Sequence, residues 1–257
     1  MRSILRIART EVLEHTRQPW MLFILAANYA LWLLIFGTLF LVLDGASSQP
    51  EVAQLIRQRL QAFGVAYDAF LKLATSSLGT LLFTNLPLFV AIMSGTSVLH
   101  DRECGTMPFL MLAPISRRQL LVGKLAGAMV VPFLFHLLLV GPSSLLLGRL
   151  SVLAPQADTL GASVAWWVAF LVGAPASAAF VGALGTVISA LSRDMRTSMQ
   201  YTSFFISILS LGIGYVLVDG ISAGPWLQLL FAGVCLVAAA LTLVIGARLI
   251  SRDVSSI

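Results

Sequence analysis

Six apolar runs, each long enough to cross a lipid bilayer, constrain this chain more than any other feature of its sequence. A hydrocarbon core of about 30 Å needs roughly 20 consecutive apolar residues in a helix. The runs cover residues 20–43, 77–99, 120–147, 163–190, 199–218 and 226–247. Only 11% of the residues are charged, whereas a soluble domain carries about 25%. The sequence therefore predicts an all-α, polytopic membrane protein, with one six-helix transmembrane domain over residues 20–250 and a short tail at 251–257.

The distribution of basic residues predicts how this domain is oriented. Of the 16 lysines and arginines, 12 fall in residues 1–19, 100–124, 191–198 and 248–257, and four fall in the intervening segments on the other side. Basic residues accumulate on the cytoplasmic side of membrane proteins. We therefore expect both termini in the cytoplasm and the chain in a bacterial-type cytoplasmic (inner) membrane. The net charge of +5 then reflects topology and does not indicate a nucleic-acid partner.

Residues 1–19 form a basic amphipathic segment. On a helical wheel one face carries Ile4, Leu5, Ala8 and Val12, and the other carries Arg2, Arg6, Arg9 and Arg17. This pattern is typical of a helix that lies flat in the interface of the membrane, in contact with lipid. A merely solvated basic tail is the alternative.

Residues 44–76, on the extracytoplasmic side, carry an apolar stripe at alternating steps of three and four. The stripe comprises Ala53, Ile56, Leu60, Phe63, Tyr67, Phe70 and Ala74. This periodicity predicts a helical segment, with a break at Gly64. Its apolar face needs a covering surface. A structural lid or dimer contact is one interpretation, and a substrate gate or the receptor for an extracytoplasmic protein partner is the other.

Residues 100–119 form the longest polar break on the cytoplasmic side. Thr106 can cap a short helix from Met107 to Leu112, which Pro114 then ends. Ser116 with Gln119 three residues later forms a capping box that opens the next long helix. A short amphipathic helix across the ends of two spans is a docking element for a soluble partner.

This loop resembles the cytoplasmic loop of the type 2 (ABC-2 type) ABC-transporter permeases. The resemblance rests on Glu103-Cys104-Gly105-Thr106, Leu110, Leu112, Pro114-Ile115-Ser116-Arg117 and Gly123-Lys124, and the six-span plan extends it over the chain. In that family the loop carries the coupling helix, which sits on an ABC ATPase subunit, and an elbow helix like residues 1–19 precedes the first span. The resemblance implies an exporter with two ATPase copies and a second permease copy, which is either the same chain or a sister chain.

From the resemblance and the charge pattern we expect the ATPase to contact two loops. The residues expected at the main ATPase contact are Asp101, Arg102, Glu103, Gly105, Thr106, Phe109, Leu110, Leu112, Pro114, Arg117 and Arg118. Of these, Phe109, Leu110 and Leu112 would transmit the movement of the ATPase to the permease. A second, smaller contact is expected at Arg193, Asp194 and Arg196.

The chain shows no nucleotide-binding motif of its own. The Gly123-Lys124 pair has Arg118 where a Walker A loop needs its first glycine, and Leu125 follows the lysine. No catalytic motif or metal-ligand cluster is evident either. We therefore expect no enzymatic activity, no catalytic residue, no metal site and no bound cofactor, with ATP and Mg²⁺ held by the partner ATPase.

Asn28, Asn85 and His136 are polar residues that lie within the apolar runs. Such residues are candidates for a transport pathway or for hydrogen bonds between helices. His136 also leaves open a proton-coupled secondary transporter, although no Asp or Glu falls within the six apolar cores. A further alternative is a membrane scaffold that transmits mechanical work from an ATPase without moving a substrate.

In the fourth run, Ala174, Ala178 and Gly182 predict a close approach to another helix, and Pro175 predicts a kink.

Overall fold

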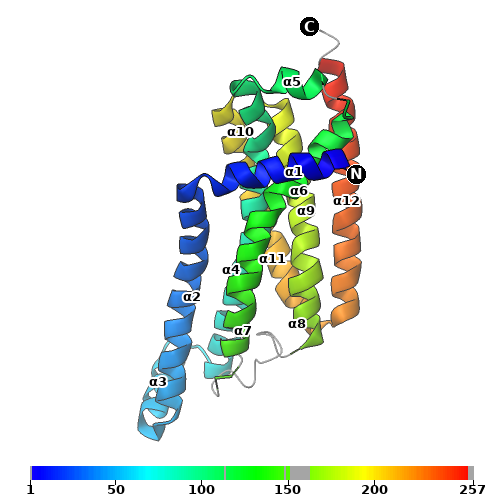
Figure 1. Cartoon of the computed structure of the whole chain (residues 1–257). Coiled ribbons are helices and arrows are strands. Elements are labelled where there is room, and N and C mark those ends of the chain that lie inside the picture. Colours follow the sequence, from blue (N-terminus) through cyan, green and yellow to red (C-terminus); the bar gives the residue numbers. More distant parts are fainter. Residues whose placement is uncertain (1, 113, 148, 151–162, 254–257) are drawn as a thin grey trace.

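The computed structural model describes residues 2–112, 114–147, 149–150 and 163–253, and in these residues the regular structure is entirely helical (Figure 1). Six helical stretches are long and apolar enough to cross a membrane: α2 (Pro19–Ser47), α4 (Tyr67–Glu103), α6–η1–α7 (Arg117–Leu147), α8–η3–α9 (Val164–Leu191), α10–η4–α11 (Met195–Ser222) and α12 (Pro225–Asp253), which is apolar as far as Leu249. The predicted all-α, six-span fold class is confirmed. The remaining helices are α1 (Arg2–Thr16), α3 (Pro50–Ala62) and α5 (Met107–Leu112).

Helix α4 lies at the centre of the bundle and packs closely on α9 (Ala174–Leu191) and α11 (Ser207–Ser222). Glycines make these crossings close. A Cβ atom at Gly185 would lie 2.7 Å from the carbonyl oxygen of Ala91, and one at Gly214 would lie 2.6 Å from that of Thr80. Ala174, Ala178 and Gly182 also face this core, so the predicted small-residue contact is confirmed. Close backbone approach replaces the hydrophobic effect as the main source of helix association within lipid.

Two of the spans contain a π-helical turn beside a proline. The turn η1 (His136–Val140) lies just before Pro142, and η3 (Ala169–Gly173) lies just before Pro175. A proline ring clashes with the carbonyl group four residues earlier. A wider turn relieves that clash without ending the helix. The irregularity predicted at Pro175 therefore takes the form of a π turn. A third π turn, η4 (Thr202–Ile206), joins α10 (Met195–Tyr201) to α11.

Helix α1 lies across the bundle and packs on α6 (Arg117–Phe135) (Figure 1). Gly123 and Gly127 make this crossing possible, because a Cβ atom at Gly123 would lie 2.8 Å from Ile7 Cβ. Packing of this kind argues against a solvated tail. The face of α1 turned to the bundle differs from the one expected, however: Leu5 is exposed, whereas Glu11 and His15 are buried.

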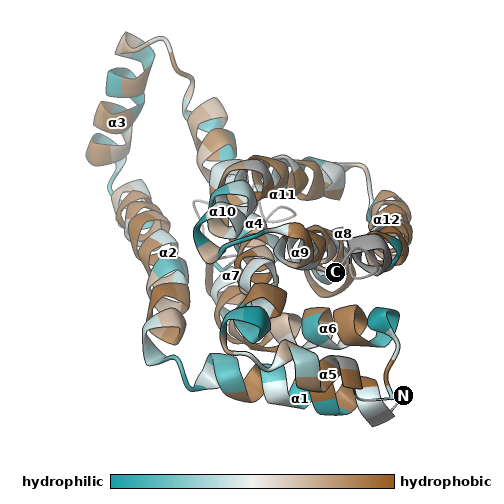
Figure 2. Ribbon diagram, turned by 90° about the horizontal axis from the view of Figure 1, so that it is seen from above, coloured by the Kyte–Doolittle hydropathy of each residue, from teal (hydrophilic) through white to brown (hydrophobic). Residues whose placement is uncertain are grey.

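Helices α2 and α3 form an arm that stands beside the bundle (Figure 2). Many apolar side chains of α2 are exposed, although Leu25, Tyr29, Phe40 and Leu43 are buried. The segment 44–76 contains α3 and the start of α4, and the break predicted at Gly64 is confirmed by its φ of 74°. The apolar stripe is only partly covered, since Phe63 is 81% exposed.

Candidate functional site

The short helix α5 protrudes at one end of the bundle, which we call the α5 end (Figure 1). Its bounds, Met107–Leu112, are the ones predicted from the sequence. Gly105 adopts a φ of 70° and turns the chain after α4. The Thr106 hydroxyl then donates to the backbone and side-chain oxygens of Asp101, both at 3.1 Å. Thr106 thus ties the start of α5 to the end of α4.

Among the described side chains of α5, two apolar ones are anchored to the bundle and two are exposed. Met107 is buried and Leu110 is half-buried against the core. Phe109 and Leu112, by contrast, are 74% and 84% exposed. The exposed pair has no described partner within the chain, whereas Leu110 holds the helix to the bundle. The three residues that the sequence grouped as one contact surface therefore have two different roles.

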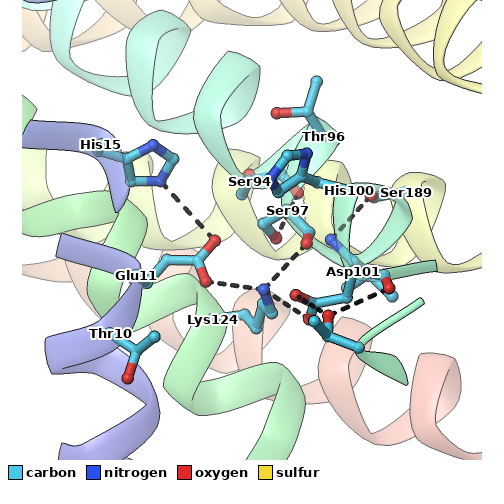
Figure 3. Close-up of polar contacts among 12 residues, drawn as sticks. Thr10, Glu11, His15, Ser94, Thr96, Ser97, His100, Asp101, Lys124 and Ser189 are labelled. Carbon is cyan, nitrogen blue, oxygen red and sulfur yellow. Dashed lines mark hydrogen bonds and ion pairs between the residues drawn. The ribbon is translucent and has the colours of Figure 1, made fainter. Parts of the chain in front are cut away.

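Below α5 lies a buried charged cluster, the Lys124 triad, formed by Glu11 of α1, Asp101 of α4 and Lys124 of α6 (Figure 3). Lys124 Nζ lies 2.7 Å from Glu11 Oε2, 2.8 Å from Asp101 Oδ2 and 2.9 Å from the carbonyl oxygen of Ser97. The ammonium group has three N–H bonds, so each can face one of these oxygens. Such complete coordination offsets the cost of placing charges away from water. The triad joins α1, α4 and α6 at the root of α5.

The triad contains two carboxyl groups and only one cation. Burial raises the pKa of the Glu11 carboxyl to about 7, and the Lys124 ammonium only partly opposes this. His15, one helical turn further along α1, lies 3.8 Å from Glu11. Burial, helped by Lys124 and His100, lowers the pKa of His15 to about 4, so its imidazole is neutral at pH 7. Glu11 is therefore the group of this cluster that takes up or loses a proton near neutral pH.

A cavity of about 390 Å³ separates α1 from α5. Glu11, Asp101 and Lys124 form part of its lining, together with Arg6 and Phe109. Movement of α5 toward or away from α1 would therefore change the surroundings of the triad directly.

The charged residues expected to hold the partner occupy different environments. Arg102 donates to the carbonyl oxygens of Ala190, at 2.7 Å, and Ser192, at 3.3 Å, so it covers the C-terminal end of α9. Arg118 and Glu103 are exposed beside α5. Pro114 is also exposed and Arg117 is half-buried, while Ser116 and Gln119 form the predicted capping box of α6.

The second expected contact, between α9 and α10, is also partly structural. Asp194 accepts hydrogen bonds from the backbone N–H and the hydroxyl of Thr197, both at 2.8 Å. These bonds lower the pKa of Asp194 below its usual value. Arg193 and Arg196 are exposed.

His136 lies among aromatic rings in the bundle interior and is fully buried. Its ring stacks on Phe170 at a centroid distance of 4.7 Å, and its Nδ1 lies 3.4 Å from the hydroxyl oxygen of Tyr29. Phe83 also contacts the ring. This enclosure joins α2, α4, η1 and η3.

Asn85 in α4 is buried, whereas Asn28 in α2 is half-buried. Neither Asn85 Nδ2 nor Asn28 Oδ1 has a hydrogen-bond partner among the described residues. Within that part of the chain, no three His, Cys, Asp or Glu side chains gather as a metal site would require.

The sequence interpretation missed Glu11, His15 and the central role of Lys124. A signal was present, because Glu11 and His15 follow Ile4 and Ala8 at helical spacing, and Lys124 stands within an apolar run. Charges placed on an apolar face indicate a buried partner. The partner itself is not visible in the sequence, since Glu11 and Lys124 are 113 positions apart.

The six membrane-length helices in the described part of the chain define it as an integral, α-helical membrane protein. Residues 5–255 match the family described as ABC-2 family transporter protein, and the chain belongs to that family. It is therefore a permease of the ABC-transporter class, and membership implies an ABC ATPase partner and a dimeric arrangement in general terms. A search among curated proteins found no match to the chain.

Proposed function

We propose that this chain is the permease subunit of an ABC exporter and that a separate ATPase subunit drives it by docking on α5. The observation that carries the proposal is the exposure of Phe109 and Leu112 on a helix that Thr106 and Leu110 anchor to the bundle. Exposed apolar side chains on a firmly held helix suit a contact that must transmit force, because packed elements pass on displacement.

In this proposal the α5 end faces the cytoplasm, where ATP is available. The excess of basic residues on the segments at this end supports that orientation. The ATPase subunit supplies the nucleotide site with ATP and Mg²⁺, and this chain contributes no catalytic group and holds no cofactor. The exposed charges of Glu103 and Arg118 beside α5 would set the orientation of the docked subunit, with Arg193 and Arg196 as a second contact.

The Lys124 triad would pass the movement on. A push on Phe109 and Leu112 displaces α5, and the hydrogen bonds from Thr106 transfer that displacement to Asp101. Asp101 holds Lys124, which in turn holds Glu11. The start of α6 and the whole of α1 would therefore move together with α5.

Two copies of the ATPase would act on two permease chains, either identical or sister chains, with the substrate passing between them. Export follows from the resemblance of the loop to the type 2 permeases. The proposed membrane is a bacterial-type cytoplasmic membrane, and both termini would lie on its cytoplasmic side.

A pull-down from native membranes tests the docking. The tagged chain should retain an ATPase subunit, and the double substitution Phe109→Asp with Leu112→Asp should abolish this. Leu110 is left intact, because its half-buried side chain supports the fold. The control is Phe63→Asp, which introduces one aspartate at a similarly exposed phenylalanine at the opposite end. Retention of the ATPase by the double variant would refute docking on α5.

A second candidate function is a scaffold that transmits mechanical work to an extracytoplasmic protein. The exposed Phe63 and the partly covered stripe of residues 44–76 favour a partner there. Reconstitution with the ATPase separates the two functions. An exporter shows substrate-stimulated ATP hydrolysis with flux, whereas a scaffold shows stimulation by a protein partner without flux.

The aromatic enclosure of His136 makes proton-coupled secondary transport the weakest of the three candidates. A proton relay needs a route to water, and His136 is surrounded by the rings of Tyr29, Phe83 and Phe170. Asn28 and Asn85 remain candidates for contacts along the pathway between two permease copies.

A further inference from the structure

A groove of about 600 Å³ lies between α9 and the α10–η4–α11 helix. Its apolar walls include Leu184 and Ile188 from α9, and Ile206 and Leu209 from η4 and α11. At the α5 end the connection between α9 and α10 lines the groove with Arg193 and Asp194, and we call this polar end its mouth. We call this feature the α9–α11 groove.

The two walls of the groove have lengths comparable to one leaflet of a bilayer. Along α9 it reaches from Leu191 back to Leu184, and along α10–α11 it reaches from Asp194 to Leu209. At 1.5 Å per residue these stretches are about 10 Å and about 22 Å long. Half of a hydrocarbon core is about 15 Å. An acyl chain entering from the mouth therefore finds apolar walls over the depth that it normally occupies.

The charge at the mouth selects the headgroup. Asp194 is already engaged by Thr197, so its carboxylate serves the first turn of α10. The carbonyl groups at the end of α9 are likewise covered by Arg102. Arg193 and the neighbouring Arg196 are exposed and form no ion pair within the described part of the chain. Besides the hydrogen bonds from Thr197, the charge of Arg196 helps to lower the pKa of the Asp194 carboxyl, so Arg196 is partly balanced by that carboxylate. With two arginines and one aspartate, this region still carries a net positive charge that is available to a ligand.

We propose that the α9–α11 groove binds one anionic phospholipid, with an acyl chain between α9 and α11 and the phosphate group at Arg193 and Arg196. An acyl chain gains little free energy by leaving the bilayer for an apolar groove, so the acyl chain alone cannot select one lipid over another. Basic groups at the membrane surface supply it, because they attract anionic headgroups. Arg193 and Arg196 are also the second contact proposed for the ATPase, so lipid binding is measured on the permease chain without the ATPase or a transported substrate.

Binding is measured on the full chain in lipid nanodiscs, followed by native mass spectrometry of the released protein. Phosphatidylglycerol is titrated into phosphatidylcholine, and the adducts of each lipid are counted. The wild-type chain should retain phosphatidylglycerol in preference to phosphatidylcholine. Arg193→Gln and Arg196→Gln should each weaken this retention about fivefold, the effect of removing one basic group near a membrane surface. The matched control, Arg59→Gln on α3 at the opposite end, should leave it unchanged.

A second variant tests the groove itself. Leu209→Trp places an indole between the walls and should reduce retention of phosphatidylglycerol while both arginines remain. Gel filtration and thermal unfolding at wild-type values establish that each variant is folded. Equal retention of both lipids, or retention that survives Arg193→Gln and Leu209→Trp, would overturn the proposal. So would a disulfide-linked dimer through Leu209→Cys in a Cys104→Ser, Cys235→Ser background, since a second copy of the chain would then cover the groove.

Discussion

Lys124 Nζ lies 2.7 Å from Glu11 Oε2, and this buried contact fixes helix α1 to the first turns of α6. Both residues are only 3% exposed. Asp101, at the end of α4, binds the same ammonium group from the other side. The contact therefore connects three segments of the chain at the point from which α5 projects.

The substitution Lys124→Met tests how much this contact contributes to the stability of the fold. The variant keeps an unbranched side chain but leaves two carboxyl groups buried without a cation. Removing one member of a buried ionic cluster costs about 3–5 kcal/mol. We expect a lower midpoint of thermal unfolding in detergent. The control is the triple variant Glu11→Gln, Asp101→Asn, Lys124→Met, which has no buried charge and should recover most of the loss. An unchanged midpoint for Lys124→Met alone would show that the triad contributes little.

Stability should depend on pH through Glu11 and His15 in opposite directions. The folded-state pKa of Glu11 is raised from 4.5 to about 7, so its contribution is complete below pH 4.5 and is lost as the pH rises toward 7. The pKa of His15 is lowered from 6.5 to about 4, so its contribution is complete above pH 6.5 and is lost as the pH falls toward 4. In the wild-type chain the two slopes oppose each other between pH 4.5 and 6.5.

Single variants should separate the two slopes. With Glu11→Gln, the unfolding midpoint should fall as the pH is lowered from 6.5 to 4, because only the His15 contribution remains. With His15→Gln, it should fall as the pH is raised from 4.5 to 7. Melting curves across this range provide the measurement, and identical profiles for both variants would contradict the assignment.

Gly127→Ala should weaken the packing of α1 on α6. The added methyl group would lie 2.9 Å from the carbonyl oxygen of Ala8, which is backbone and yields little. Overpacking of this kind costs about 1–3 kcal/mol. Gly233→Ala on α12 is the matched control, because its methyl group meets nothing within 4 Å. Differential unfolding of the two variants, together with faster proteolysis within residues 2–16 of Gly127→Ala, would confirm the prediction. Equal behaviour would argue against a close crossing.

Arg102 and Arg118 should differ in what they lose on substitution. Arg102→Gln removes the charged hydrogen bonds to Ala190 and Ser192, each worth about 1.5–3 kcal/mol. It should therefore lower the unfolding midpoint. Arg118→Gln, at an exposed position beside α5, should leave the midpoint unchanged and weaken binding of the ATPase subunit. Thermal unfolding measures the first effect, and a pull-down of the ATPase from the same preparations measures the second. Lost ATPase binding in Arg102→Gln, with a lower unfolding midpoint in Arg118→Gln, would contradict the prediction.

His136→Phe should preserve the fold. The phenyl ring can occupy the stack against Phe170, and the removed Nε2 has no described partner. The hydroxyl of Tyr29 loses its neighbour, so a modest decrease in stability is expected. If ATP hydrolysis by the assembled transporter keeps its rate and its pH profile, a proton-relay role for His136 is excluded. Loss of ATP hydrolysis in a fully folded His136→Phe variant would instead support a proton-relay role.

The sequence by itself determined the spans and α5. In lipid, every backbone N–H and C=O group must be paired within its own helix, so an apolar run of sufficient length is a local signal. The limits of α5 and the capping box at Ser116 and Gln119 likewise depend on residues a few positions apart. Gly64 marked the break after α3 for the same reason.

Only the tertiary structure decided which of the proposed site residues work together. Phe109 and Leu110 are neighbours in sequence, but one is exposed and the other supports the fold. Arg102 turned out to cover the end of α9, and Glu11 to pair with Lys124. These outcomes depend on how each helix is rotated and how closely it crosses its neighbours. Glycines such as Gly127 set those distances between segments more than 100 residues apart, and hydropathy along the chain carries no record of them.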